Sequence, residues 1–252
     1  MRNIRIISRL DIKGPNVVKG VFTEGLRVVG NPKELVNRYY KDGADELLYM
    51  DIVASLYQRN IDFNLLKSVV EGIFIPVTVG GGIRSLGDID NALRAGADKV
   101  AVNTFAINNP KFISEAVRRF GSQCIVLSVE AKKTGPNKWE AYTDGGREKT
   151  GKDAIGWVKK AIELGVGEVI ITSIDRDGSG RGYDAELNSK VMSFANIPVI
   201  VHGGASSPAS FKDILDMCHP DALSAASVFH YQSHSIHEVK KFLKKNNFQV
   251  RI

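Results

Sequence analysis

Two acidic residues, Asp11 and Glu130, are the side chains of this 252-residue sequence best suited to proton transfer. Each ends a short apolar run that predicts a β-strand, and side chains on a strand alternate between its two faces. Alternation puts Asp11 on the same face as Arg9, and Glu130 on the same face as Ser128. Two opposed carboxyl groups can act as general acid and general base, one donating a proton as the other accepts one. The alternative is that Asp11 only caps a loop.

Two glycine pairs, Gly81-Gly82 and Gly203-Gly204, are placed to bind anions. Each pair follows an apolar run and precedes a helical pattern, so backbone N–H groups at an electropositive helix N-terminus can approach an anion closely. Asn103-Thr104 would complete the first site, and Ala226-Ser227 the second, with Asp177-Gly178 beside it. A tight strand-to-helix turn also requires glycine. It is the occurrence of two such sites that predicts a substrate with a phosphate at each end.

These residues fall at equivalent places in a sequence that nearly repeats itself at half its length. The segment Ile75–Ser85 returns as Ile197–Ser207 with seven of 11 positions identical. Asp11 and Glu130 keep nearly the same spacing. Because a repeat of this kind sets the architecture, we interpret the chain as two fused half-units.

The elements that must position the candidate residues alternate between β-rich runs and helical patterns, which favours parallel strands joined by crossover helices. We predict strands near residues 4–11, 46–52, 75–80, 98–103, 124–130, 168–175, 197–202 and 221–226, each followed by a helix. This is a (β/α)8 TIM barrel of two repeated half-barrels, forming one domain over residues 1–252. An open doubly wound sheet would not explain eight units. The polar stretch Lys132–Gly151 is expected to be a long loop.

Composition is that of a globular protein, with 43% hydrophobic and 25% charged residues. No apolar run approaches a membrane span and no signal peptide is visible, so we expect a cytoplasmic protein. Cys124 and Cys218 lack metal or redox spacing and are expected to be reduced, buried thiols. The net charge of +6 is modest, and no basic motif that would bind nucleic acid is present. Lysines of the last helix, Lys240 among them, are expected on its solvated face.

The chain resembles the cyclase subunit of imidazole glycerol phosphate synthase over its whole length. The matching stretches are Leu10-Asp11, Val17–Gly20, Gly43–Glu46, Thr78–Ser85, Gly96–Val100, Phe120–Val126, Asp175–Gly178 and Ser227–His230. The resemblance implies that ammonia from a separate glutaminase subunit reacts with a bisphosphorylated aminoimidazole carboxamide ribonucleotide, without metal or organic cofactor. Asp11 and Glu130 would be catalytic, and Lys19 would join the glycine turns in binding the substrate.

The same resemblance implies an ammonia gate on the barrel floor. A ring of alternating charges occupies this place in the family, and its positions are held here by Arg5, Glu46, Lys99 and Glu168. Asp98 would contact the glutaminase in a heterodimer. A plain structural ring of ion pairs is the alternative.

Several residues depart from the family pattern, among them Ser128 and Ser224 in the interior, Gly25 and Val28 in the first active-site loop, and three at the mouth of the barrel. Glu130 replaces an aspartate, Arg9 a small residue that is usually cysteine, and His202 another small residue. A buried guanidinium needs an anion, and we expect Arg9 to pair with Glu130 first, or else with Asp11, keeping Glu130 ionised. His202 would be either a new acid or base, or a hydrogen-bonded spectator.

These departures leave alternative functions open. One is a paralogue that conducts ammonia from its glutaminase to another enzyme, such as one amidating a sugar in surface-polysaccharide synthesis. Another is the related isomerase barrel that precedes this step.

Overall fold

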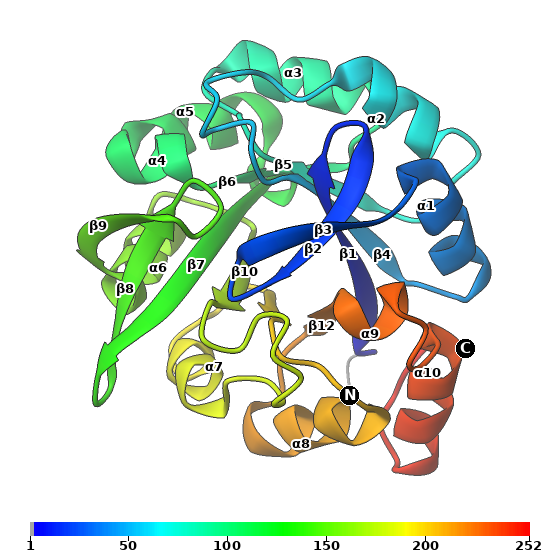
Figure 1. Cartoon of the computed structure of the whole chain (residues 1–252). Helices are drawn as coiled ribbons and strands as arrows, with labels where there is room; N and C mark the ends of the chain where they lie inside the picture. Colours follow the sequence, from blue (N-terminus) through cyan, green and yellow to red (C-terminus); the bar gives the residue numbers. More distant parts are fainter. Residues whose placement is uncertain (1–2) are drawn as a thin grey trace.

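The computed structural model describes residues 3–252, in which eight parallel strands close into a barrel (Figure 1). The barrel strands are β1 (Arg5–Lys13), β4 (Glu46–Asp51), β5 (Val77–Gly80), β6 (Lys99–Val102), β7 (Ile125–Gly135), β10 (Glu168–Ser173), β11 (Val199–His202) and β12 (Ala222–Ala225). They run around the barrel in chain order, and the pairs β12–β1 and β7–β10 complete the circle. The predicted (β/α)8 fold is confirmed, and each predicted strand overlaps an observed one.

Helices lie outside the barrel strands, as Figure 1 shows. They are α1 (Pro32–Lys41), α2 (Phe63–Val70), α3 (Leu86–Arg94), α4 (Thr104–Asn108), α5 (Lys111–Phe120), α6 (Ala154–Glu163), α7 (Ala185–Met192), α8 (Pro208–Cys218), α9 (Ser227–His230) and α10 (Ile236–Lys245). Side-chain oxygens of Asn31, Asp62 and Asp184 cap α1, α2 and α7 by accepting hydrogen bonds from first-turn N–H groups. Within residues 3–252, no helix has both the length and the apolar character needed to cross a membrane.

Apolar side chains form two separate clusters. The larger lies between the helices and the outer surface of the barrel and includes Leu66, Ile89 and Phe211. The smaller fills the barrel interior and includes Ile7 and Ile170. Burial of this apolar surface is the main driving force for closing the barrel.

An antiparallel hairpin extends from the carboxyl end of β1, and another from that of β7. The first consists of β2 (Asn16–Val21) and β3 (Glu24–Gly30), and the second of β8 (Lys138–Thr143) and β9 (Glu148–Asp153). The prediction that Lys132–Gly151 is a long loop is therefore wrong. Strand pairing satisfies the backbone polar groups that an irregular loop of this length would leave without regular partners.

The two halves of the chain repeat the same order of elements. Each half begins with a barrel strand and a hairpin, continues with three helix-separated barrel strands, and ends with a short helix followed by a longer one. The terminal helix pairs are α4 with α5 and α9 with α10, and a short 3-10 helix, η1 (Ser122–Cys124), leads into the second half. Each half therefore supplies an equivalent set of strand ends to the same rim.

Two expectations about single side chains need correction. Cys124 and Cys218 are free, as expected, but each is only partly buried. Lys240 is buried rather than solvated, and its Nζ lies 2.7 Å from Asp45 Oδ1 and donates to the Gly43 carbonyl oxygen at 2.6 Å. Both acceptors compensate the ammonium group for the water that it loses. The helical pattern around Lys240 could not show that the turn at Gly43 and Asp45, far away in the sequence, supplies its hydrogen-bond acceptors.

Candidate active site

Asp11 and Glu130 stand at the carboxyl ends of opposed strands. Asp11 lies on β1 and Glu130 on β7, four steps apart around the barrel in either direction. Each residue is only 5% exposed. The structure thus brings the two predicted acids to the same rim, where parallel strands of a barrel present their loops.

Cations surround the Asp11 carboxylate. Arg9 Nε donates to Asp11 Oδ1 at 2.7 Å, and Lys19 Nζ donates to Oδ2 at 3.3 Å. Burial disfavours the charged form, but the attraction of Arg9 and Lys19 outweighs it and lowers the pKa of Asp11. Asp11 is therefore a fixed anion at neutral pH.

Glu130 has a different environment. Its carboxyl group accepts a short hydrogen bond from Asn103 Nδ2, which also donates to the Tyr142 carbonyl oxygen at 3.0 Å. Burial raises the pKa of Glu130 to about 7, even though Arg9 favours the ionised form. The expectation that Arg9 pairs first with Glu130 and keeps it ionised is wrong. Its second choice, Asp11, is the observed partner, because Asp11 is two residues away on the same face of the same strand.

The first predicted phosphate site is an open pocket of about 290 Å³. Gly81, Gly82, Asn103 and Thr104 line it together with Glu130, so the structure brings these predicted residues into one cavity. Gly81 has φ +103°, and a Cβ there would lie 2.1 Å from the Asp51 carbonyl oxygen. Only glycine permits this close approach between two backbone segments.

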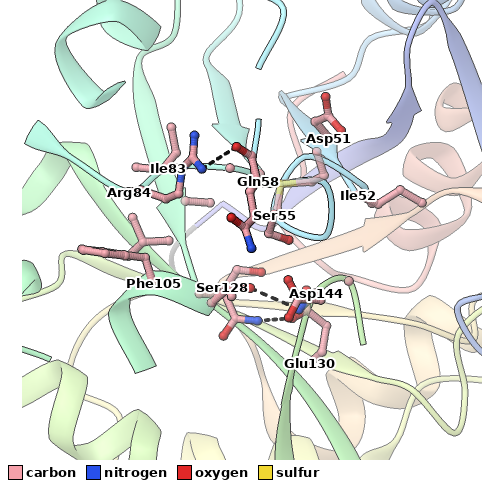
Figure 2. Close-up of a pocket in the computed structure, with 18 of the residues that line it drawn as sticks. Asp51, Ile52, Ser55, Gln58, Ile83, Arg84, Phe105, Ser128, Glu130 and Asp144 are labelled. Atoms are coloured by element: carbon pink, nitrogen blue, oxygen red, sulfur yellow. Dashed lines mark hydrogen bonds between the residues drawn. The ribbon is translucent and has the colours of Figure 1, made fainter. Parts of the chain in front are cut away.

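Sequence reasoning missed other residues of this pocket. Ser55 and Gln58 come from the segment after β4, and Asp144 comes from the turn between β8 and β9. Figure 2 shows Glu130 beside Asp144, and Arg84 pointing toward Gln58, whose carbonyl oxygen accepts its hydrogen bond at 2.6 Å. The Asp144-Gly145-Gly146 turn between two strand-like runs was a signal that could have revealed the hairpin.

The second predicted phosphate site is a shallow pocket with a free volume of about 10 Å³. The residues that line it include all those predicted for this site, namely Asp177, Gly178, Gly203, Gly204, Ala226 and Ser227, together with Lys19, which was predicted to bind the substrate without being assigned to either site. Lys19 comes from β2, so the first hairpin closes over the turn that follows β10. Its Nζ contacts both Asp177 and Asp11, and so links the second phosphate site to the first acid.

His202 is buried among polar groups at the end of β11. Its Nδ1 lies 3.1 Å from Ser224 Oγ, while its Nε2 lies 3.4 Å from Asp177 Oδ1 without the geometry of a hydrogen bond. Burial, with Arg9 nearby, lowers the pKa of His202 despite the carboxylate. The imidazole is therefore neutral at neutral pH, held by Ser224.

The charged residues of the floor form a closed ring. Arg5 lies 2.8 Å from Glu46 and 2.7 Å from Glu168, and Lys99 lies 2.6 Å from Glu46 and 2.7 Å from Glu168. Arg5 and Lys99 are partly exposed, whereas the two glutamates are buried. The four predicted positions thus meet at the amino ends of their strands. Asp98, next to Lys99, is exposed and accepts a hydrogen bond from the Val77 backbone N–H at 2.8 Å.

The fold is a (β/α)8 barrel made of two half-barrels. Each half-barrel supplies one glycine-lined site and one buried carboxyl group to the same end of the barrel. The family model described as histidine biosynthesis protein matches residues 5–235, and the chain belongs to this family. A Legionella pneumophila protein named imidazole glycerol phosphate synthase subunit HisF is 56% identical over 212 residues, which are 84% of this chain and 100% of the relative. A Dehalococcoides mccartyi protein of the same name is 48% identical over 252 residues, covering 100% of this chain and 99% of the relative.

Proposed function

We propose that this chain is the cyclase subunit of an imidazole glycerol phosphate synthase. In this function it combines ammonia, derived from glutamine, with a bisphosphorylated aminoimidazole carboxamide ribonucleotide. The products are imidazole glycerol phosphate and an aminoimidazole carboxamide ribotide. One observation carries the proposal: the carboxyl groups of Asp11 and Glu130 end opposed strands between two glycine-lined sites. The names of the relatives over their full lengths support the same reaction.

The two acids take different parts in the proposed reaction. Forming a carbon–nitrogen bond from ammonia and releasing an amine both require protons to move. Glu130, with a pKa of about 7, can donate and accept a proton near neutrality. Asp11 stays ionised and holds Arg9 and Lys19 in place at the mouth, beside the carboxyl group that moves the proton.

The glycine-lined sites would hold the two ends of the substrate. One phosphate would bind at Gly81-Gly82 with Asn103-Thr104, and the other at Gly203-Gly204 with Ala226-Ser227. Lys19 gives the second site a cation, and Gly178 allows the first hairpin to approach it. This second site has little free volume, so a phosphate would bind at its open surface, against the glycine turns.

The floor would receive ammonia from a glutaminase partner in a heterodimer. The ring of Arg5, Glu46, Lys99 and Glu168 would act as the gate, and exposed Asp98 beside it would contact the partner. A ring held by four ion pairs can open when a partner offers a competing charge. Mixing the chain with a glutaminase subunit and measuring complex formation by calorimetry tests this surface. Asp98→Ala should weaken the complex, and equal affinity would contradict the contact.

Steady-state turnover of the bisphosphorylated ribonucleotide with ammonium salt tests the reaction itself. Product absorbance is followed while the concentration of free ammonia is held constant from neutral to alkaline pH. The wild-type chain should turn over, and Asp11→Asn and Glu130→Gln should each lose at least about a hundredfold in rate. Glu186→Gln, an exposed substitution outside the mouth, serves as the control. Tight substrate binding without turnover would instead indicate a chain that passes ammonia to another enzyme, such as one amidating a sugar.

A further inference from the structure

The barrel interior is built in layers between the floor ring and the mouth. On each of four strands, a residue of the floor ring is followed by two further inward-facing residues, at positions two and four residues later. These series are Arg5, Ile7 and Arg9 on β1; Glu46, Leu48 and Met50 on β4; Lys99, Ala101 and Asn103 along β6; and Glu168, Ile170 and Thr172 on β10. Because strand side chains alternate, each series follows one inner face from floor to mouth.

The middle layer is mostly apolar, with two buried serines, Ser224 beside Ile7 and Ser128 beside Ile170. Ile7, Leu48, Ala101 and Ile170 belong to the inner cluster, which Val126, Ile200 and Ala222 extend around the barrel. Neutral ammonia can cross such a layer more readily than an ammonium ion, which would lose most of its hydration and find only hydroxyl oxygens as acceptors. The layer therefore favours neutral ammonia over ammonium but leaves the final exclusion of cations to the residues at the mouth.

Arg9 lies directly beyond this layer and crosses the barrel. Its Nε donates to Asp11 on β1, while its Nη1 donates to Thr172 Oγ1 on β10 at 3.1 Å. β11 and β12 separate β1 from β10, so the guanidinium spans the interior rather than lying along the wall. Arg9 is only 6% exposed and lines the same pocket as Glu130.

Arg9 also balances the charge of the mouth. Asp11 and Asp177 are the anions that contact the cations Lys19 and Arg9, while Glu130 lines the same pocket as Arg9 and is only partly ionised near neutral pH. Removing Arg9 would leave one negative charge without a partner, with carboxylate and hydroxyl oxygens of Asp11 and Thr172 around the vacated space. Oxygen atoms around a negative charge can replace the hydration shell of a monovalent cation.

We infer that Arg9 is a cation filter at the inner end of the passage. Its fixed positive charge keeps ammonium and other monovalent cations out of the mouth, while its N–H groups can donate to the lone pair of arriving ammonia. An arginine that excludes cations from a narrow path is a known physical device in membrane pores, and the same electrostatics apply inside this barrel. The inference rests on the proposed function for its ammonia, and it deepens that function by assigning the selectivity to one residue.

Crystals of the full chain soaked in rubidium chloride test the filter without any need for turnover. The wild type should show no anomalous rubidium peak between the floor ring and Asp11. Arg9→Met should show a peak within contact of Asp11 and Thr172. Arg9→Lys, which keeps the charge, should remain empty, and Arg9→Gln replaces the methionine variant if that one does not fold. A peak in the wild type, or none in either uncharged variant, would overturn the inference.

Turnover gives a second readout that separates this inference from the proposed function. Ammonia-dependent cyclase activity is measured at constant ionic strength while sodium is exchanged for potassium, a cation similar in size to ammonium. The wild type and Arg94→Met, a surface control, should be unaffected, whereas Arg9→Met should slow by about tenfold. Equal rates in both salts for Arg9→Met contradict the filter. Absence of wild-type turnover contradicts the proposed function instead, and the rubidium experiment then decides the role of Arg9.

Discussion

Lys19 and Asp177 form a buried ion pair that ties the first hairpin to the loop after β10. Lys19 Nζ lies 2.9 Å from Asp177 Oδ1 and 2.7 Å from Oδ2, and both side chains are almost fully buried. The Phe22 backbone N–H also donates to the Asp177 carbonyl oxygen at 2.8 Å. The position of β2 over the second glycine-lined site therefore depends on one residue that comes more than 150 positions later in the chain.

Replacing the lysine of this pair should destabilise the protein markedly. Lys19→Met leaves Asp177 buried without its main cation, and we expect the free energy of unfolding to fall by about 3 kcal/mol. Urea denaturation measures this loss. Lys33→Met is the control, because Lys33 and Glu71 form an exposed pair 3.6 Å apart, worth less than about 1 kcal/mol. A similar small loss for both variants would show that the buried pair does not hold the hairpin.

A close backbone approach at Gly178 should make this glycine irreplaceable. Its φ is +68°, and a Cβ there would lie 2.3 Å from the Gly20 carbonyl oxygen of the first hairpin. Gly180 has nearly the same φ, +66°, but its nearest atom would be Ser206 Cβ at 3.8 Å. Gly180→Ala should therefore cost only the backbone strain of about 1 kcal/mol.

Gly178→Ala should cost at least ~1 kcal/mol more, because the hairpin must move as well. Comparing thermal or urea unfolding of the two variants isolates the effect of the contact. Inorganic phosphate binding should also weaken in Gly178→Ala alone. Equal stability of the two variants would mean that the hairpin relaxes freely.

Glu130 should make stability depend on pH in a defined direction. Its pKa in the folded protein is about 7, against an ordinary value of 4.5, so the folded state retains a proton that the unfolded chain releases between these values. The resulting stabilisation is fully present below pH 4.5 and is lost as pH rises through 7. Relative to Glu130→Gln, the wild type should lose on the order of 3 kcal/mol over this interval.

Denaturation of both proteins at several pH values measures the loss. Asp11→Asn provides the contrast. Despite the opposing effect of burial, Arg9 and Lys19 hold the pKa of Asp11 below its ordinary value, so Asp11 itself does not titrate between about pH 5 and 8. Because the Asp11 charge helps to raise the pKa of Glu130, the offset of this variant from wild type should change with pH in this range, but less than that of Glu130→Gln. A pH-independent offset for Glu130→Gln would contradict the raised pKa.

The floor ring should respond strongly to the loss of one anion. Glu46 accepts from Arg5, Lys99 and Thr78, at 2.8, 2.6 and 2.9 Å. Glu46→Gln leaves both cations with Glu168 alone, and because those cations are partly exposed we expect a loss of about 2 kcal/mol in unfolding free energy. Glu186→Gln, which breaks an exposed pair with Lys133, should lose less than about 1 kcal/mol. Losses of the same size would indicate that solvent already screens the ring.

Most of the barrel could be predicted from sequence because its strands carry a repeated, nearly continuous apolar pattern. Ile75–Ser85 and Ile197–Ser207 placed β5 and β11 correctly, together with the glycine turns that follow them. The second hairpin was missed because Lys132–Gly151 is polar on its exposed face. The run Lys138–Ala141 does alternate, with Trp139 and Ala141 buried.

The sequence predicted which residues lie at the candidate site, but not which of them form hydrogen bonds or ion pairs with one another. Alternation gives the face on which a side chain lies, so Arg9, Asp11 and Glu130 were all assigned to the mouth correctly. It does not give the rotamer that a long side chain adopts, nor the competing partner Asn103 that Glu130 finds on the neighbouring strand end. The partner of Arg9 was therefore decided by local geometry that only coordinates reveal.

The matching order of elements in the two halves has a consequence for the orientation of a bound ligand. A molecule with a phosphate at each end meets two nearly equivalent sites related by a half turn about the barrel axis, and it can in principle enter either way round. The two orientations differ in energy only through residues at which the halves have diverged. Arg9 on β1 corresponds to Ser128 on β7, and Asp11 corresponds to Glu130. Because these equivalent positions hold different residues in the two halves, the two orientations of a bound ligand differ in binding energy.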